Sequence, residues 1–467
     1  MTMRTRDELI APRPGHRSLF RWAALVGAAL CVLVLAGCGN DNGTTAEDES
    51  LSGGGATVAD ASSHAFEFPA PNLSGASFNR HVEGDAVFER TFVTAPAPRF
   101  GGLGPLFNAS ACVGCHARNG STRDSRLLRV SLPGTGPDGG PLPLPGYGQQ
   151  VQDHAVFGKA PEATIVLREV TAGGRYGDGG DYTLVGFDPE MSDAWMPYDG
   201  GWQRSLRFAP PVFGLGLLEA VPEADILSRE DPADADRDGI SGRANRVPDL
   251  EKGGTSLGRF GWKAGAPSLV QQSAGAYHAD MGLTNPFHPV DESTGRPGLD
   301  DGLPDDPEVD METVDLAAFY VRTLAVPARR TPDDPTVRRG AALFTDMGCA
   351  ACHAPRLVTG PNADPPEFAN QVIRPYTDML LHDMGEGLAD HRPEFLADGR
   401  EWRTPPLWGV GLRRLVNGHE QFLHDGRARG LEEAILWHGG EAAAAQSRYR
   451  MLPLADRRAV IAFLESL

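Results

Sequence analysis

Two clusters of cysteine and histidine carry the most specific chemistry in this chain. They read CVGCH at 112–116 and CAACH at 349–353. In this pattern each thiol adds to a vinyl group of haem, and the adjacent histidine supplies an axial nitrogen to the iron. Zinc knuckles, a thioredoxin-like motif and tight disulfides are the alternatives, but zinc knuckles would stand closer together and the other two need no histidine. We therefore predict two covalently bound haem c groups, with these residues as the sites of attachment and ligation: Cys112, Cys115, His116, Cys349, Cys352 and His353.

The flanks of the two motifs also repeat. Each motif is followed by alanine and preceded by Leu-Phe and four further residues, and each is later followed by a Pro-Pro segment and an amphipathic helix pattern. The same order in both halves favours an internal duplication. The paired segments are 106–117 with 343–354, 210–217 with 405–412, and 315–324 with 457–467.

This repeat predicts a mainly α fold with two cytochrome c-like haem domains. The first domain is expected over 64–327 and the second over 335–467, because proline and charged residues cluster between them. The first is longer, and its excess is rich in glycine, proline and aspartate with short β-like runs such as 163–170. We expect this excess to form β-containing loop insertions.

The N-terminus predicts export. An arginine-rich leader precedes a short apolar run that ends in Leu-Ala-Gly-Cys38, which resembles a bacterial lipobox. Residues 1–37 are then a lipoprotein signal peptide and Cys38 is the lipidated residue. Residues 38–63 are small, polar and acidic, which is typical of a flexible tether. The protein is expected to face the periplasm or the cell exterior, anchored to the membrane through the lipid only.

Composition narrows the classes of partner. The 57 glycines and 38 prolines predict long loops, and the net charge of −19 argues against nucleic acid, which needs a basic footprint. An acidic surface instead suits a basic redox partner that is steered by charge.

The chain resembles the bacterial dihaem oxidoreductases, also described as dihaem peroxidases or thiol oxidoreductases, over nearly all of its length after residue 37, and most closely at 101–120, 202–221, 257–285 and 376–440. The resemblance rests on the two CxxCH motifs and on RTPP at 403–406, FLHDGRA at 422–428 and LEEAILWH at 431–438. The chain is more distantly similar to dihaem cytochrome c peroxidases and to the dihaem enzyme that matures the methylamine dehydrogenase cofactor. The resemblance implies peroxide-linked or other redox chemistry at haem.

The resemblance also implies ligands and catalytic groups. His438 stands where the peroxidases have a distal methionine, so it is the expected second ligand of the C-terminal iron, and two imidazoles would lower the potential of that haem. A surface histidine at a helix end is the alternative reading of His438, and His382, Met384 and His424 compete for the ligand position.

The N-terminal haem lacks the nearby distal histidine of the peroxidases, which allows an open iron face. Glu219 and Arg207 are the candidate catalytic residues for acid–base work or charge stabilisation there, each with a structural role as the alternative. Four histidines could still close this face: His64, His81, His154 and His278.

One acidic loop is a candidate calcium site. Residues 234–245 have carboxylates at the first, third and fifth positions and glycine at the sixth, as hard Ca²⁺ requires, but lack the closing glutamate. A solvated turn is the alternative. The candidate ligands are Asp234, Asp236, Asp238 and Asn245.

The leading function is a dihaem c-type oxidoreductase, peroxidase-like, that passes electrons from a small redox protein (a cytochrome c or copper protein) through the C-terminal haem to the N-terminal haem. A non-catalytic dihaem electron-transfer protein is the second hypothesis. A surface-anchored binding component with structural haems is the third.

Overall fold

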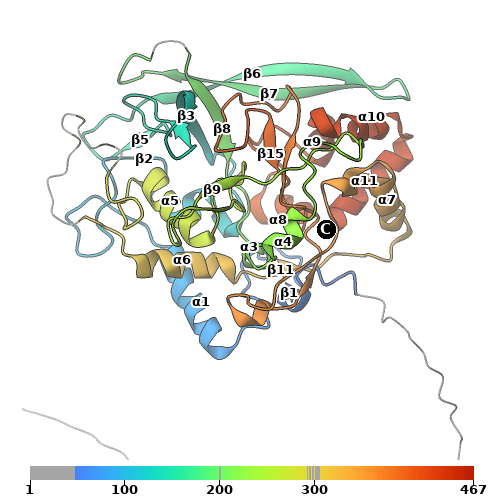
Figure 1. The fold of residues 1–467 in the computed structure, drawn as a ribbon, viewed down its shortest axis with the longest axis horizontal. Helices are drawn as coiled ribbons and strands as arrows, with labels where there is room; N and C mark the ends of the chain where they lie inside the picture. Colours follow the sequence, from blue (N-terminus) through green and yellow to red (C-terminus); the bar gives the residue numbers. More distant parts are fainter. Residues whose placement is uncertain (1–47, 199–200, 292, 294–295, 297–298, 300–305) are drawn as a thin grey trace, which may run out of the picture. The chain divides into compact units, whose positions relative to one another are not determined.

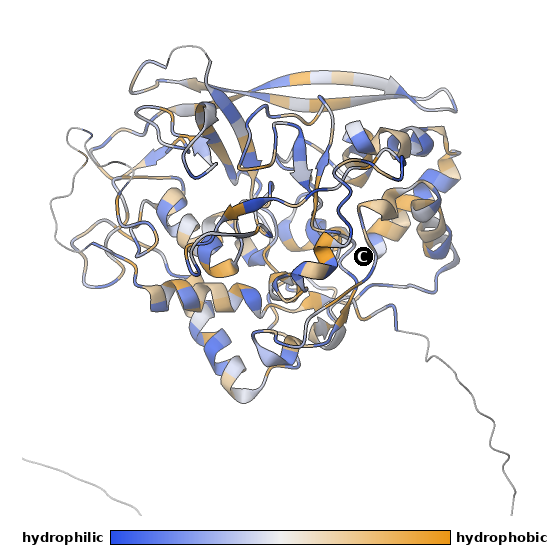
Figure 2. Ribbon diagram, in the orientation of Figure 1, coloured by the Kyte–Doolittle hydropathy of each residue, from blue (hydrophilic) through white to orange (hydrophobic). Residues whose placement is uncertain are grey.

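Two pairs of packed helices frame the structure, which is a computed structural model (Figure 1). α1 (Gly75–Phe88) packs on α6 (Met311–Arg322), and α7 (Pro335–Asp346) packs on α11 (Leu454–Ser466). Figure 2 shows apolar residues alternating with polar ones along these helices, as an amphipathic helix on a core requires. The structure describes residues 48–198, 201–291, 293, 296, 299 and 306–467. The predicted signal peptide and Cys38 lie outside these residues.

A glycine at the contact lets each helix pair approach closely. A Cβ atom at Gly84 of α1 would collide with the Leu316 carbonyl of α6, and one at Gly340 of α7 would collide with the Ala459 carbonyl of α11. α1 precedes the first CxxCH motif and α7 precedes the second, while α6 and α11 are the closing helices predicted from periodicity. The helix pairs therefore repeat in the same order as the sequence motifs, which supports duplication.

Apart from α5, which has 13 residues, the remaining α-helices are short, and they lie along the chain between the two members of each pair. Two of them, α5 and α8, end on a glycine with positive φ, Gly282 (φ 66°) and Gly418 (φ 73°). Within the described residues no helix is long and apolar enough to cross a membrane. These helices are α2 (Cys112–Cys115), α3 (Leu215–Glu219), α4 (Glu223–Leu227), α5 (Leu269–Met281), α8 (Arg413–Asn417), α9 (Leu431–Trp437) and α10 (Ala443–Met451).

The strands form small separate sheets. β4 (Pro141–Leu142), β3 (Arg126–Thr135) and β8 (Gln203–Phe208) make a three-stranded sheet, and β6 (Thr164–Arg175) pairs with β7 (Asp181–Ser192) as a long antiparallel ribbon. The others are two-stranded: β1 (Thr57–Val58) with β11 (Val326–Pro327), β2 (Leu106–Phe107) with β5 (His154–Ala155), β9 (Arg246–Pro248) with β10 (Thr255–Leu257), β12 (Leu357–Val358) with β13 (Val372–Ile373), and β14 (Leu381–Asp383) with β15 (Glu401–Arg403).

The prediction of a mainly α fold was wrong. Only 29 % of the structure is helical and 20 % is strand. The glycine- and proline-rich connections cut the helices short, and their backbone groups pair in short strands instead. The β6–β7 ribbon contributes most to the strand content. It includes the predicted β-like run at 163–170 from Thr164 onward.

Two hydrophobic clusters account for most of the core. The larger one includes α1, α5 and α6, and extends to Trp408 and Leu412 in the C-terminal half. The smaller one gathers α7 and α11 around Phe344 and Phe463. Residues 48–467 cluster as one unit, and the domain division between 327 and 335 stays a prediction.

The described part of the predicted tether is ordered. Thr57 and Val58 pair in parallel with Val326 and Pro327, and Ala56 is fully buried. Backbone pairing and a small buried side chain fix this segment without large apolar residues, so its composition alone suggested a tether.

Candidate functional site

The first CxxCH motif lies on α2, a single helical turn. That turn brings the two thiols to one side of the backbone and leaves His116 just beyond it. The His116 ring donates its Nδ1–H to the Pro210 carbonyl at 2.9 Å, so Nε2 carries the free lone pair. Pro210 begins the first repeated Pro-Pro segment, which explains why that segment follows the motif.

The second CxxCH motif has the same arrangement. Cys349–Ala351 forms a 3₁₀ turn, and the His353 ring donates its Nδ1–H to the Tyr376 carbonyl at 3.0 Å. A phenylalanine ring lies near each histidine: Phe88 is 6.5 Å from His116, and Phe344 is 6.2 Å from His353, between ring centroids.

The protonation state of the two motif histidines favours iron ligation at both centres. Burial lowers the pKa of His116, and it lowers the pKa of His353 to about 4, against the carbonyl of Tyr376, which raises it. Both imidazoles are therefore neutral at pH 7, the form in which histidine binds metals. The four cysteines of the motifs are free thiols, so no disulfide competes with attachment.

His438 lies near the second centre. It follows the last residue of α9, and its ring donates Nδ1–H to the Ala434 carbonyl at 2.7 Å, which leaves Nε2 free. His438 is near enough to His353 to lower the pKa of that residue, and burial lowers the pKa of His438 itself. Two neutral imidazoles with free Nε2 atoms thus lie close enough to influence each other electrostatically.

His382 is engaged in a different way. Its Nε2 contacts Asp378 at 2.8 Å and its Nδ1 contacts Glu441 at 2.7 Å, with the Cys352 sulfur at 3.6 Å from Nδ1. Burial opposes its charge, but these hydrogen bonds raise the pKa of His382 to about 12. A protonated ring with both nitrogens bound offers no lone pair to a metal. Sequence reasoning missed both Asp378, which lies four residues before His382, and Glu441, which a distant segment brings to it.

Asp280 is the charged group that most affects the first centre. Burial has the largest effect and raises the pKa of Cys112 and Cys115, and Asp280 raises both further. For His116, burial lowers the pKa and Asp280 partly offsets that fall. The Gln150 amide donates to Asp280 at 2.9 Å. The side-chain oxygens of Gln150, Gln152 and Tyr277 are buried in this region without a protein partner.

The four histidines that could close this centre each have one ring nitrogen in contact with another group. His81 contacts Thr323 at 2.8 Å, and the Nε2 of His278 donates to the Val290 carbonyl at 2.9 Å. His154 contacts Asp153 at 2.8 Å and His64 contacts Glu67.

The two predicted catalytic residues lie in structural networks. Glu219 accepts from the Leu269 amide at 2.8 Å, at the start of α5, and pairs with Arg322 at 2.6 Å. Arg207 donates to Ser205 at 2.6 Å and pairs with Asp390 and Glu394 at 3.2 Å. The structure does not bring Glu219 and Arg207 into one constellation.

Arg207 belongs to a buried cluster around Trp402. Arg207 and Lys263 lie over the Trp402 ring, at 4.8 Å and 4.4 Å from its centroid, and the His424 ring stacks on it at 3.7 Å. Lys263 is fully buried and pairs with Asp390 at 2.9 Å. His424 therefore packs in this cluster, where burial and the neighbouring cations keep its pKa well below the usual value.

The predicted calcium ligands are divided. Carboxylate oxygens of Asp234 and Asp236 lie within 4.8 Å of one another and of Asp231. Asn245 is buried elsewhere, where its amide donates to the Lys263 carbonyl at 2.7 Å. Asp238 accepts from the Ile240 amide at 2.8 Å within the turn.

The repeated Pro-Pro segments contact each other reciprocally. A Cβ at Gly214 would lie 2.7 Å from the Trp408 ring, and one at Gly409 would lie 2.5 Å from the Phe213 ring. Gly214 and Gly409 have matching backbone angles (φ 72° and 71°, ψ 0°) that favour glycine. Equivalent aromatic residues thus pack on equivalent glycines.

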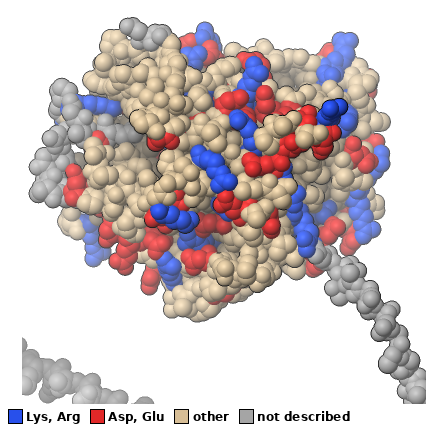
Figure 3. Space-filling model, in the orientation of Figure 1, with Lys and Arg blue, Asp and Glu red and all other residues tan. Residues whose placement is uncertain are grey.

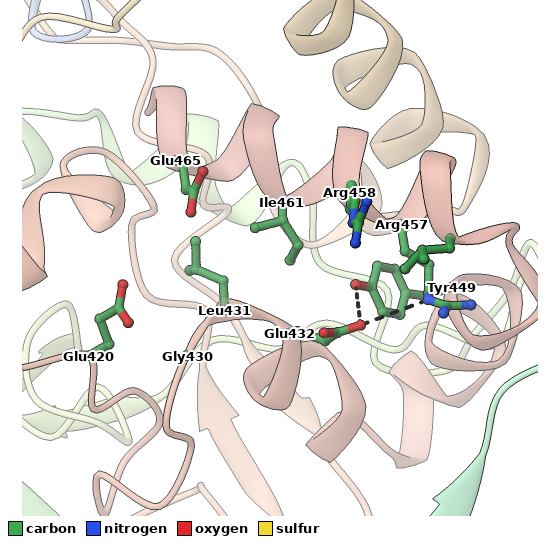
Figure 4. Close-up of a pocket in the computed structure, with 10 residues that line it drawn as sticks. Glu420, Gly430, Leu431, Glu432, Tyr449, Arg457, Arg458, Ile461 and Glu465 are labelled. Carbon is green, nitrogen blue, oxygen red and sulfur yellow. Dashed lines mark hydrogen bonds and ion pairs between the residues drawn. The ribbon is translucent and has the colours of Figure 1, made fainter. Parts of the chain in front are cut away.

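A surface pocket of about 560 Å³ lies between α9, α10 and α11 (Figure 4). Tyr449 donates to Glu432 at 3.1 Å, and Arg457 approaches the same carboxylate at 3.8 Å. Half of the lining residues are charged, and they include no cysteine or histidine.

The residues around the motifs fit haem. Arg413 is buried and donates to Ser121 at 3.0 Å, five residues after His116, and its Nε has no partner within the described chain. Burial alone lowers its pKa to about 10, with no carboxylate near it. A propionate would supply the missing anion, and the unpartnered oxygens of Gln150, Gln152 and Tyr277 match a polar group that the protein itself does not provide.

A comparison with protein families gives one match. The family described as "Di-haem oxidoreductase, putative peroxidase" matches residues 46–130 and 198–467. The unmatched segment between them contains the second half of β3 and all of β4, β5 and the β6–β7 ribbon. No curated protein matches the chain.

Proposed function

Because the chain belongs to the di-haem oxidoreductase family, we propose that it is a c-type dihaem oxidoreductase with peroxidase-like activity. The observation that carries this proposal is the difference between two otherwise equivalent centres. Each proximal histidine has its Nδ1 bonded to a carbonyl, but within the described residues the pKa of His353 is also lowered by a nearby imidazole with a free Nε2, that of His438.

Both haems are covalently attached in this proposal, through Cys112 and Cys115 and through Cys349 and Cys352. Bound haem supplies one-electron redox chemistry and, where one axial position is open, a site for peroxide. The chain keeps His116 and His353 neutral and fixes each ring through its carbonyl partner.

The centres have separate roles. The His353–His438 pair favours electron transfer, since two protein ligands leave no place for substrate. The first centre is the reaction site, where the buried amide of Gln150 and the carboxylate of Asp280 form a polar surround. Such groups can orient a small oxidant and exchange protons with it.

Hydrogen bonds and one packing contact link the segments that hold the two proximal histidines. His353 is bonded to the Tyr376 carbonyl, and the preceding Pro375 accepts from the Leu407 amide at 2.8 Å. Trp408 follows and packs on Gly214, four residues after Pro210, the partner of His116. We assign the direction of electron flow from the second centre to the first.

Charge suggests the electron donor. The net charge is −19, and Figure 3 shows acidic side chains gathered across the face in view, with basic ones between them. A small basic cytochrome c or copper protein is the donor we propose, steered by this field. Export and a lipid on Cys38 would keep the enzyme at the membrane surface, where such donors circulate.

Two measurements on the purified holoprotein test the proposal. Haem quantification should give two haems per chain, and one after replacing either cysteine pair with alanine. Hydrogen peroxide should then be consumed only when a reduced donor is present. Two haems without peroxide consumption would instead support the non-catalytic electron-transfer protein.

A further inference from the structure

The β6–β7 ribbon belongs to the segment of this chain that the family match leaves out. It lies between the matched residues 46–130 and 198–467. In Figure 1 the ribbon runs along one edge of the molecule from the β3–β8 side to α9 and α10. Its role therefore has to be argued from its own contacts.

The second strand of the ribbon, β7, packs directly on α9. Leu184 is 5 % exposed and belongs to the same hydrophobic cluster as Leu436 of α9. Gly186 faces the Trp437 ring, which would lie 3.4 Å from a Cβ at that position. Leu436 and Trp437 are the two residues immediately before His438, so β7 covers the end of α9 that presents the ligand.

The tip of the ribbon is fastened to the neighbouring helices. The Gly177 amide donates to the Arg450 carbonyl of α10 at 2.9 Å. Arg457 of α11 pairs with Asp178 at 3.0 Å and lies over the Tyr176 ring at 3.9 Å. The same Arg457 approaches Glu432 in the first turn of α9 (Figure 4). Arg457 thus joins the ribbon tip to the helix that β7 covers.

The orientation of His438 depends on α9. Its ring is bonded at Nδ1 to the Ala434 carbonyl, one turn earlier in the same helix, at 2.7 Å. The ring therefore turns and shifts with α9. α9 has only seven residues, too few for a stable isolated helix, so its position depends on packing by its neighbours.

We propose that the β6–β7 ribbon is a positioning element that keeps α9 in place and thereby keeps His438 on the second haem iron. Leu184 and Asp178 are its positioning residues. This inference rests on the proposed function, because it takes His438 as the distal ligand. It assigns to the ribbon a part in setting the ligation, and hence the potential, of the electron-transfer centre.

The test compares ribbon variants in the haem-loaded protein by electron paramagnetic resonance. Leu184→Ala removes packing on α9, and Asp178→Ala removes the pair with Arg457 at a more exposed position. Val166→Ala, at a position of β6 that is 43 % exposed, is the matched control. We expect the high-spin fraction of the second haem to rise about tenfold in Leu184→Ala, as when the ligated state loses about 1.4 kcal/mol relative to the open state. Asp178→Ala should move in the same direction and Val166→Ala should match the wild type.

A further variant, His438→Gly, separates this inference from the proposed function. If His438→Gly converts the second haem to high spin while Leu184→Ala and Asp178→Ala both keep the low-spin signal of the wild type, the ribbon does not position the ligand. If His438→Gly leaves the low-spin signal unchanged, His438 is not the ligand and the proposed division of roles fails with it. Should Leu184→Ala not fold, Asp178→Ala decides the inference alone.

Discussion

His438 lies near enough to His353 to lower the pKa of that residue, and the two rings donate their Nδ1–H groups to backbone carbonyls at 2.7 Å and 3.0 Å respectively. This relationship makes the two centres of a duplicated chain unequal. The first centre has the same proximal arrangement at His116. There the largest effect on the histidine pKa after burial comes from the Asp280 carboxylate and not from another imidazole.

Replacing His438 with methionine should raise the reduction potential of the second haem. A thioether in place of one imidazole favours the reduced iron. We expect a rise of about 0.1–0.2 V, within the roughly 0.8 V over which axial ligands set haem potentials. Potentiometric titration of the holoprotein measures it, and the first haem, whose potential should stay constant, is the internal control. An unchanged second potential would count against His438 as a ligand.

Glu219→Gln should lower stability rather than abolish turnover. The carboxylate caps the start of α5 and pairs with the buried Arg322, so its loss should cost about 1–3 kcal/mol of unfolding free energy. Urea unfolding and peroxide kinetics should be measured on the same preparation. A loss of turnover of a hundredfold or more with unchanged stability would restore Glu219 as a catalytic acid.

Arg207→Met should be strongly destabilising. It removes one cation from a buried cluster and leaves Asp390 and Glu394 short of a partner, which typically costs about 3–5 kcal/mol. Arg207→Lys, which keeps the charge, should lose less. Equal urea midpoints for wild type and Arg207→Met would show that the cluster contributes no net stability.

Stability should fall in acid partly through Glu394. Burial would raise its pKa, but Arg207, Arg392, Arg129 and Lys263 lower the pKa of Glu394 to about 2. The folded pKa lies below the unfolded value, so this contribution is complete above about pH 4.5 and is lost as the pH falls toward 2. The urea midpoint of Glu394→Gln should therefore change less than that of the wild type between pH 5 and pH 3. Parallel pH profiles would exclude this role.

Turnover with a basic donor should depend on salt. Raising the ionic strength from about 0.01 M to 0.15 M shortens the Debye length from about 30 Å to about 8 Å, which screens a protein with net charge −19. We expect kcat/KM for the donor to fall about tenfold or more. An acidic donor of similar potential is the control, and equal rates at both ionic strengths would rule out electrostatic steering.

The local motifs could be predicted from the sequence, but most of their surroundings could not. The CxxCH spacing fixes a single turn, and helical periodicity correctly predicts α6 and α11. These features need only neighbouring residues.

The partners of the functional residues come from distant segments. Tyr376 accepts from His353 through its backbone carbonyl. Every residue has this group, so the residue type at position 376 does not reveal the contact. Glu441 reaches His382 across 59 positions, and Leu184 reaches α9 from an insertion. Helix content was overestimated for a related reason, since glycine and proline connections pair as strands only once the chain has folded.

The most direct test is the electron paramagnetic resonance spectrum of the resting ferric holoprotein, before and after hydrogen peroxide. We predict one high-spin and one low-spin haem per chain, with peroxide changing the high-spin signal first. Two low-spin haems with no response to peroxide would contradict the proposal that the first centre is an open reaction site.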